Sequence, residues 1–377
     1  MIRKKFINFS NLDYILILLT LICVIFGIVT ISSAVKSVDG GVKYIIIQSV
    51  AAVLGFCLMF FVSMIDYEKL GNCTKAIYII CIAFLCAVLV FGTGLEDTGS
   101  KSWIRFGPIG VQPSEFVKIG YIITFSKLCS SVGDELNKPK NIMKLLAHSA
   151  IIMGLIMLQP DFGTTMVFIM IFIGIVFAAR ISYKYIIATG ITIAAAIPII
   201  WNFFLADYQK NRIMVLFNPE ADPYASGYHV MQSKIAIGSG GIFGKGFGQG
   251  TQTQLGYLPV KHTDFIYSVI GEELGLIGCL AVAFLLFGIV LRCFYNARNS
   301  KNNFGAYICV GVGCMLLAHI FENIGMCIGL MPVTGIPLPF FSYGGSSMIT
   351  SLTAIGLVLS VRKKQNEITF EDQQIQQ

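Results

Sequence analysis

The stretch GTQTQLGYLPVKHTDFIYSVIGEE, residues 250–273, contains a sharp change from polar to apolar sequence. A glycine-rich run, GSGGIFGKGFGQG (238–250), precedes it, and a long apolar segment follows. That segment is long enough to cross the ~30 Å hydrocarbon core of a bilayer as a helix. His262, Thr263 and Asp264 lie at the junction. The stretch therefore predicts a titratable cluster at the end of a membrane span.

Composition indicates that the whole chain belongs in a membrane. Of 377 residues, 55% are hydrophobic and 12% are charged, and the mean hydropathy is +0.76. Soluble domains carry about 25% charged residues, roughly twice this fraction. The eleven cysteines include no CxxC spacing, which argues against a metal-thiolate site. We expect an all-α polytopic membrane protein.

Hydropathy predicts about ten transmembrane helices. We expect a large external loop between spans 7 and 8 and a re-entrant external loop before span 10. Residues 1–364 are expected to form one membrane domain, and residues 365–377 a disordered cytoplasmic tail. The first span exceeds the apolar region of a signal peptide, so it should remain uncleaved. The expected spans are residues 12–33, 44–64, 76–92, 113–128, 145–158, 162–179, 185–205, 265–291, 304–330 and 346–361.

The distribution of lysine and arginine predicts the orientation. If both termini are cytoplasmic, most of these cations fall on the cytoplasmic side, as the positive-inside rule requires. The loop around Trp103 and the long loop 206–264 are then external. The net charge of +7 follows mainly from this topology, so we expect no nucleic-acid partner.

Two glycine-rich segments do not fit ordinary loops or nucleotide sites. The run 238–250 contains no GxGxxG, and Lys245 is followed by Gly246 rather than by the Ser or Thr of a phosphate-binding loop. We expect a flexible external loop or a re-entrant segment there. The stretch 331–348, MPVTGIPLPFFSYGGSSM, is too apolar for a loop and too broken for a helix. It predicts a re-entrant loop lining a cavity, with an ordered turn as the alternative.

Asp264 has two interpretations at this point. Thr263 or Asp264 could cap the helix that begins near Phe265. Asp264 could equally serve as a base, since a helix N-terminus favours its ionised form. Glu272 and Glu273 lie too far along the helix, and on other faces, to pair with it.

Other ionisable residues lie in the predicted spans, where they are candidates for function. Glu115 and Lys118 are spaced i, i+3 and should form an ion pair. His319, Glu322 and Asn323 share one helical face. Six of these ionisable or amide residues fall toward the external side, namely Glu115, Lys118, Asp161, Asp264, Glu322 and Asn323. A pocket open to the outer leaflet fits this pattern better than a path through the membrane.

Several motifs together resemble the SEDS family (shape, elongation, division and sporulation), in particular its RodA-type branch. The resemblance extends from about residue 13 to residue 363. The matching pieces are GSKSWI (99–104), QPSE (112–115), QPDFGT (159–164), the glycine run with residues 250–278, and PLPFFSYGGSS (337–347). The chain departs from the family at Val260-Lys261, where relatives carry Glu then Arg or Ala, and at Ser102, where a basic residue is commoner.

The resemblance implies a peptidoglycan glycosyltransferase that joins lipid II disaccharides outside the bacterial cytoplasmic membrane and releases undecaprenyl diphosphate. It implies that Asp264 is the essential external-loop aspartate and Trp103 a functional aromatic. It also implies a class B penicillin-binding transpeptidase and elongation-complex membrane proteins as partners. Asp264 is the expected general base. The candidate substrate-binding residues are Trp103, Glu115, Lys118, Asp161, Arg212, Lys245, Lys261 and His262, and the candidate cavity residues are His319, Glu322, Asn323 and Ser342.

Three other functions are compatible with the sequence. A lipid II flippase would need polar groups that continue to the cytoplasmic half, and a non-catalytic scaffold would tolerate Asp264→Asn. A division or sporulation paralogue of the FtsW or SpoVE type would share the chemistry. No cofactor is indicated, although a divalent cation that binds diphosphate is left open.

Overall fold

The computed structural model describes residues 12–94, 100–106, 109–185, 187, 202, 210, 214–216 and 226–375. It is a helical bundle, which confirms the expected fold class. Within the described residues, seven helices are long and apolar enough to cross a membrane. The expected span 185–205 lies almost entirely outside those residues. The long helices are α1 (Tyr14–Ala34), α2 (Val42–Met64), α4 (Thr74–Phe91), α6 (Pro113–Val132), α7 (Pro139–Met157), α8 (Phe162–Ala178), α13 (Ile266–Arg298), α14 (Asn303–Cys327) and α15 (Gly345–Ile375).

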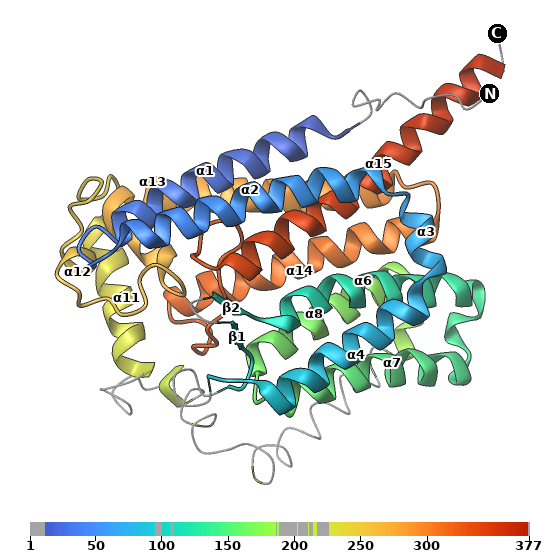
Figure 1. Cartoon of the computed structure of the whole chain (residues 1–377), viewed down its shortest axis with the longest axis horizontal. Helices are drawn as coiled ribbons and strands as arrows, with labels where there is room; N and C mark the ends of the chain where they lie inside the picture. Colours follow the sequence, from blue (N-terminus) through green and yellow to red (C-terminus); the bar gives the residue numbers. More distant parts are fainter. Residues whose placement is uncertain are drawn as a thin grey trace.

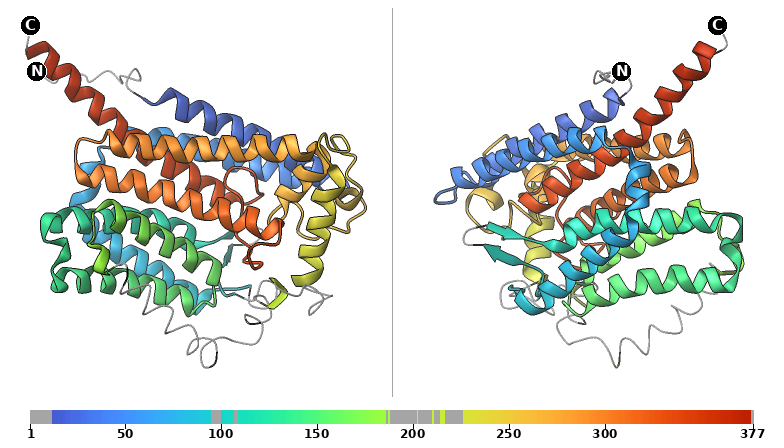
Figure 2. Two further views of the ribbon diagram at one scale, coloured as in Figure 1. Left: turned by 180° about the vertical axis from the view of Figure 1, so that it is seen from behind. Right: turned by 45° about the vertical axis from the view of Figure 1, so that its right-hand side comes forward.

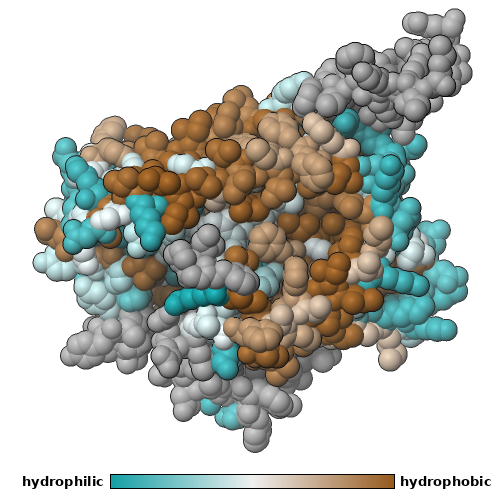
Figure 3. Space-filling model, in the orientation of Figure 1, coloured by the Kyte–Doolittle hydropathy of each residue, from teal (hydrophilic) through white to brown (hydrophobic). Residues whose placement is uncertain are grey.

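The long helices lie side by side, so the molecule has two distinct ends (Figures 1 and 2). The start of α1 and the end of α15, which carry the two termini, lie at one end. Two short helices, α11 (Ser226–Gly240) and α12 (Thr251–Gln254), lie at the other. A broad apolar band separates more polar surfaces at the two ends (Figure 3). This pattern is expected of a bundle whose helices cross a bilayer.

Helix α14 lies at the centre of the bundle and packs against α13, α8, α6 and α15. Together with α15 it is the most buried of the candidate spans. The polar residues of α14 therefore face protein rather than lipid. Short connections occur at the end with the termini, namely α3 (Tyr67–Asn72) and a 3₁₀ turn (Gly133–Asn137).

A small antiparallel hairpin is the exception to the helical fold. Strand β1 (Ile104–Phe106) pairs with β2 (Ile109–Val111) just before α6. Each strand has three residues, which is too short to produce a clear alternating pattern. For this reason the sequence did not reveal it.

Helix α13 is broken at Gly275, whose backbone has φ 67° and ψ −162°. The expected span 265–291 is therefore not one regular helix. The glycine loop, defined here as residues 240–250, bonds to the groups that the break exposes. The amides of Lys245 and Gly246 donate to the carbonyls of Glu272 and Glu273 at 3.0 Å. The Leu276 amide donates to the Gly241 carbonyl at 2.9 Å.

The break explains why the glycine loop is ordered. Non-helical backbone at membrane depth must be satisfied by protein or water, and here two broken segments satisfy each other. A Cβ on Gly275 would lie 2.4 Å from the Gly244 nitrogen. The close backbone approach and the positive φ both require glycine at this position. Of the two alternatives for this run, a flexible loop and a re-entrant segment, the flexible loop is wrong for these residues, because their backbone groups form hydrogen bonds with α13.

Candidate active site

Asp264 lies immediately before α13 and is half-buried. The N-cap of α13 is Phe265, which makes no side-chain capping bond. The prediction that Thr263 or Asp264 is the cap residue is therefore wrong. A capping role no longer accounts for an aspartate at this position.

Asn323 fixes the backbone of Asp264. It is fully buried in α14, and its Nδ2 donates to the carbonyl oxygens of Asp264 and Ile336, each at 2.8 Å. One amide group thus joins the start of α13 to the re-entrant loop, defined here as residues 328–344. A Cβ on Gly335 of this loop would stand 3.6 Å from Asp264 Oδ2. The loop therefore passes directly beside the carboxylate.

Ser342 and Tyr343 hold the other side of the same turn. The Ser342 hydroxyl donates to the Thr263 carbonyl at 2.6 Å and accepts from the Leu338 amide at 2.8 Å. The Tyr343 amide donates to the His262 carbonyl at 2.8 Å. Residues 262–264 are thus held by hydrogen bonds from α14 and from the C-terminal end of the re-entrant loop. The expectation that this loop lies beside residues 262–264 is confirmed.

His262 packs as an aromatic ring. Its ring centroid lies 4.8 Å from that of Tyr44 and 5.6 Å from that of Tyr343. Burial lowers the pKa of His262, and the nearby charge of Lys261 lowers it further. The neutral imidazole is therefore favoured at neutral pH, which suits ring packing better than diphosphate binding.

Glu115, Lys118 and His319 form a buried polar group between α6 and α14. The Lys118 ammonium lies 2.7 Å from Glu115 Oε1 and 2.9 Å from His319 Nε2. His319 Nδ1 lies 2.8 Å from the Met315 carbonyl, so Nδ1 carries the proton and Nε2 accepts from the ammonium. The expected Glu115–Lys118 pair is confirmed, and His319 joins it.

Glu322 lies between this group and the re-entrant loop. Its Oε2 accepts from the Thr334 hydroxyl at 3.3 Å, whereas Oε1 has no hydrogen-bond partner among the described residues. Glu322 also experiences the charges of Lys118 and Asp161. Thr334 is followed by Gly335, so the same segment of the loop contacts Glu322 and lies beside Asp264.

Asp161 and Trp103 belong to the hairpin side of the site. Asp161 caps α8 by accepting from the Thr164 amide at 3.0 Å, and it accepts from Ser102 at 2.9 Å. Trp103 is half-buried, pairs its backbone with Thr93 and places its ring beside Gly110. The hairpin is therefore anchored to α8 through the residue next to Trp103.

Two further candidate substrate-binding residues, Lys245 and Lys261, have structural partners in the protein. Arg212 lies outside the described residues. Lys245 pairs with Glu272 at 2.8 Å, and Lys261 donates to Ser37 at 2.8 Å and to the Thr253 carbonyl at 2.5 Å. Both lysines hold the short helix α12 against its neighbours. The described contacts thus give these two ammonium groups structural partners.

Glu272 is an organising residue that the sequence did not reveal. Its side chain is fully buried and accepts from the amides of Gln252 and Thr253 at 2.8 and 2.9 Å. The Thr253 hydroxyl donates to it at 2.8 Å. Glu273 accepts from Ser33 of α1. The two glutamates therefore fasten α12 and α1 to α13, at the level where α13 breaks.

Glu272→Gln should lower the free energy of unfolding by about 1.5–3 kcal/mol, because hydrogen bonds to an ionised acceptor are lost. The Lys245 ion pair is partly exposed and contributes little of this loss. Chemical denaturation in detergent measures the change. Glu135→Gln, which removes an exposed ion pair to Lys138, is the matched control and should change stability by less than about 1 kcal/mol. Equal effects of the two substitutions would contradict the assigned role of Glu272.

No group of three or more His, Cys, Asp or Glu side chains that could hold a metal ion occurs among the described residues. The described part of the site thus offers carboxylates singly, at Asp264, Glu322 and Asp161.

Comparison with known proteins finds relatives that match nearly the whole chain. A family model described as "Cell cycle protein", for FtsW, RodA and SpoVE, matches residues 11–367. Peptidoglycan glycosyltransferase MrdB of Escherichia coli (strain K12) is 36% identical over 360 residues, covering 95% of each chain. A chain in the solved structure "Structural coordination of polymerization and crosslinking by a peptidoglycan synthase complex" has a TM-score of 0.81 and 28% identity, covering 94% of this chain and 98% of that one. Rod shape determining protein RodA of Thermus thermophilus has a TM-score of 0.72 and 26% identity, covering 95% and 99%.

Proposed function

The chain belongs to the FtsW/RodA/SpoVE family of cell cycle proteins, and we propose that it polymerises lipid II into peptidoglycan glycan strands. Its identity to MrdB over nearly the whole of both chains supports the assignment as a peptidoglycan glycosyltransferase. Undecaprenyl diphosphate is the leaving group. The likeness to RodA supports a role in cell elongation and shape.

The single observation that carries the mechanism is the placement of Asp264. Its backbone is fixed by Asn323, the preceding carbonyl by Ser342, and its carboxylate lies beside Gly335. These contacts come from segments far apart in the sequence, and they orient one half-buried carboxylate. A general base requires such orientation before it requires any particular pKa.

In the proposed reaction, the Asp264 carboxylate takes the proton of the acceptor sugar hydroxyl. The hydroxyl oxygen then forms a bond to the anomeric carbon of the donor, and the bond from that carbon to the diphosphate oxygen breaks. Attack opposite the leaving group converts the α-linked donor into a β-linkage. Cations that neutralise the departing diphosphate would lower the barrier further, and Arg212 is our candidate for this role.

The reaction belongs at the outer face of the cytoplasmic membrane. Membrane helices and family membership place the protein in that membrane. Asp264 lies in the chain between α12 and α13, and α12 lies at the end of the bundle opposite the start of α1 (Figure 1). The distribution of lysine and arginine supports cytoplasmic termini, and therefore an external active site.

A penicillin-binding transpeptidase of class B is the proposed partner. The support is the solved synthase complex whose chain this protein resembles at a TM-score of 0.81. Such a partner would cross-link the strands that the glycosyltransferase produces. Elongation-complex membrane proteins are proposed as further partners, and the support is the likeness to a rod shape determining protein.

Purified protein, alone and with its transpeptidase, should convert labelled lipid II into glycan strands that a muramidase digests. A parallel vesicle assay measures lipid II movement across the bilayer. Movement without strand formation would show a flippase and refute the proposal. Rescue of shape after depletion of the native elongation polymerase, rather than rescue of division or sporulation, tests the branch.

A further inference from the structure

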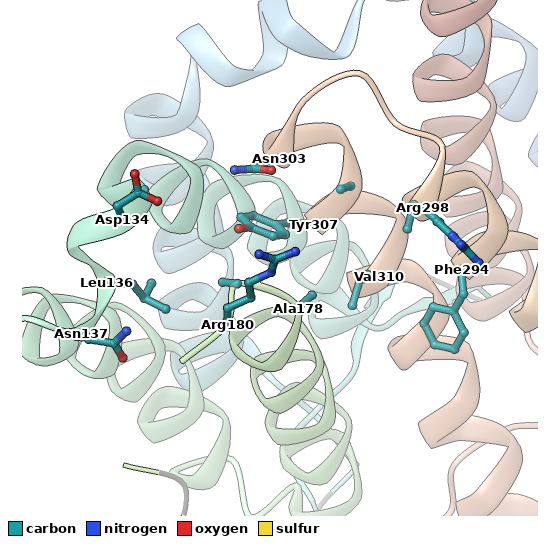
Figure 4. A pocket seen from close by; sticks show the side chains of 14 residues that line it. Asp134, Leu136, Asn137, Ala178, Arg180, Phe294, Arg298, Asn303, Tyr307 and Val310 are labelled. Carbon is teal, nitrogen blue, oxygen red and sulfur yellow. The ribbon is translucent and has the colours of Figure 1, made fainter. Parts of the chain in front are cut away.

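A second polar cavity lies far from Asp264, at the end of the bundle that carries the termini. Its volume is about 640 Å³, and it opens between the turn after α6 and the ends of α8, α13 and α14 (Figure 4). Arg180 follows α8, Arg298 ends α13, and both line the cavity. The proposed glycosyl transfer does not use this place.

Arg180 and Arg298 differ from Arg292 of the same region in having no salt bridge to a described residue. Within the described part of the chain, neither guanidinium forms an ion pair or a side-chain hydrogen bond. Arg292, six residues before Arg298 in α13, instead pairs with Asp13 at 2.7 Å. Two arginines line this cavity, and its one described acidic lining residue, Asp134, forms no salt bridge with either of them. Such guanidinium groups suit an anion with several oxygen acceptors, and phosphate matches this geometry.

The backbone of Arg180 supports a use for its side chain. Arg180 has φ 62°, directly after the C-cap Ala179 of α8. Glycine is the residue that adopts this left-handed position with least strain. Strained backbone positions are concentrated at ligand-binding and active sites, which makes the Arg180 side chain a candidate ligand-binding group. Arg180 interacts with the phenol group of Tyr307 across the cavity wall.

The helix faces below the arginines are apolar and exposed. Leu291, seven residues before Arg298, is 65% exposed, and Ile173, seven residues before Arg180, is 52% exposed. Within α13, residues seven apart lie on nearly the same face, so Leu291 shares the face of Arg298. Ile173 lies in α8, which ends two residues before Arg180. Phe294 lines the cavity itself. An occupant with a charged head and apolar chains would therefore fit both parts of this surface.

We propose that the cavity binds the phosphate headgroup of an anionic phospholipid, whose acyl chains lie along α8 and α13. Arg180 and Arg298 hold the phosphate oxygens. Asp134, at the opposite side of the cavity from Arg298 (Figure 4), accepts a hydrogen bond from a headgroup hydroxyl. Basic pockets between membrane helices recognise lipid headgroups in this way. The proposal concerns binding and stands whether or not Asp264 is the base.

The test measures the melting temperature of the purified full-length protein in detergent, with added phosphatidylglycerol, phosphatidylcholine or inorganic phosphate. Phosphatidylglycerol should raise the melting temperature, because a ligand of the native state stabilises it, and the other two should not. Arg180→Gln and Arg298→Gln should each weaken the apparent affinity about tenfold, the effect of losing one charge-assisted hydrogen bond. Lys75→Gln removes an exposed cation outside the cavity and should leave the affinity unchanged.

Arg180→Gly distinguishes the effect of backbone strain on stability from the effect of the side chain on lipid binding. It should raise the melting temperature without lipid, since glycine relieves the backbone, and it should weaken the phosphatidylglycerol response. If Arg180→Gln does not fold, the phosphatidylglycerol affinity of Arg298→Gln, a change at an exposed residue, tests the site alone. Stabilisation by inorganic phosphate equal to that by phosphatidylglycerol would assign the site to a soluble anion and overturn the lipid. An equal loss of affinity in Lys75→Gln would show diffuse surface charge and overturn the site.

Discussion

Asp264→Asn should reduce lipid II polymerisation by about 10²–10⁴-fold, the usual contribution of a general base. The asparagine amide has the shape of the carboxylate but cannot take the proton of the acceptor hydroxyl. The Asn323 bond is to the backbone carbonyl of Asp264, so the turn should keep its position. Strand formation from labelled lipid II in a single time course measures the rate, with the transpeptidase present in both samples.

The control is Asp39→Asn, an exposed aspartate in the loop between α1 and α2. It changes the charge at the same end of the bundle by the same amount and should leave the rate unchanged. The Asp264 variant should also keep the melting temperature of the unmodified protein. Polymerisation by Asp264→Asn at the normal rate would remove Asp264 as the base, whereas loss of activity with unfolding would show a structural role.

The sequence predicted the parts of this architecture that depend on local pattern. Long apolar runs predicted the membrane helices, because each must satisfy its own backbone in lipid. The i, i+3 spacing predicted the Glu115–Lys118 pair, because such neighbours meet on one helix face. The shared face of His319, Glu322 and Asn323 was predicted in the same way, and all three are buried in α14.

The sequence did not predict features that depend on distant segments. Residues around Gly275 read as continuous helix, and the break is stabilised by the glycine loop some 30 residues earlier. Lys245 appeared available for substrate because nothing local identified Glu272 as its partner. The start of α13 was misplaced because the carbonyls before it are bound by Ser342 and Asn323. Each of these outcomes requires knowledge of tertiary contacts.

Lys118→Met should lower the free energy of unfolding by about 3–5 kcal/mol, the usual cost of leaving one partner of a buried ion pair uncompensated. The Lys118 side chain has no exposed surface, and that of Glu115 is 3% exposed. Removing the ammonium leaves the Glu115 carboxylate without its counter-ion and His319 Nε2 without its donor. Chemical denaturation in detergent, followed by intrinsic fluorescence, measures the loss.

The double variant Lys118→Met with Glu115→Gln decides whether the pair itself carries the effect. With the charge of Glu115 removed as well, the uncompensated carboxylate is gone, so the double variant should be more stable than Lys118→Met alone. The exposed pair Lys138–Glu135, 62% exposed on both sides, is the matched control, and Lys138→Met should cost less than about 1 kcal/mol. If the double variant is no more stable than Lys118→Met, the stem of Lys118 is important for packing rather than for charge. Because Glu322 also experiences the charge of Lys118, a double variant that folds but polymerises slowly would connect this buried group to the Asp264 side of the site.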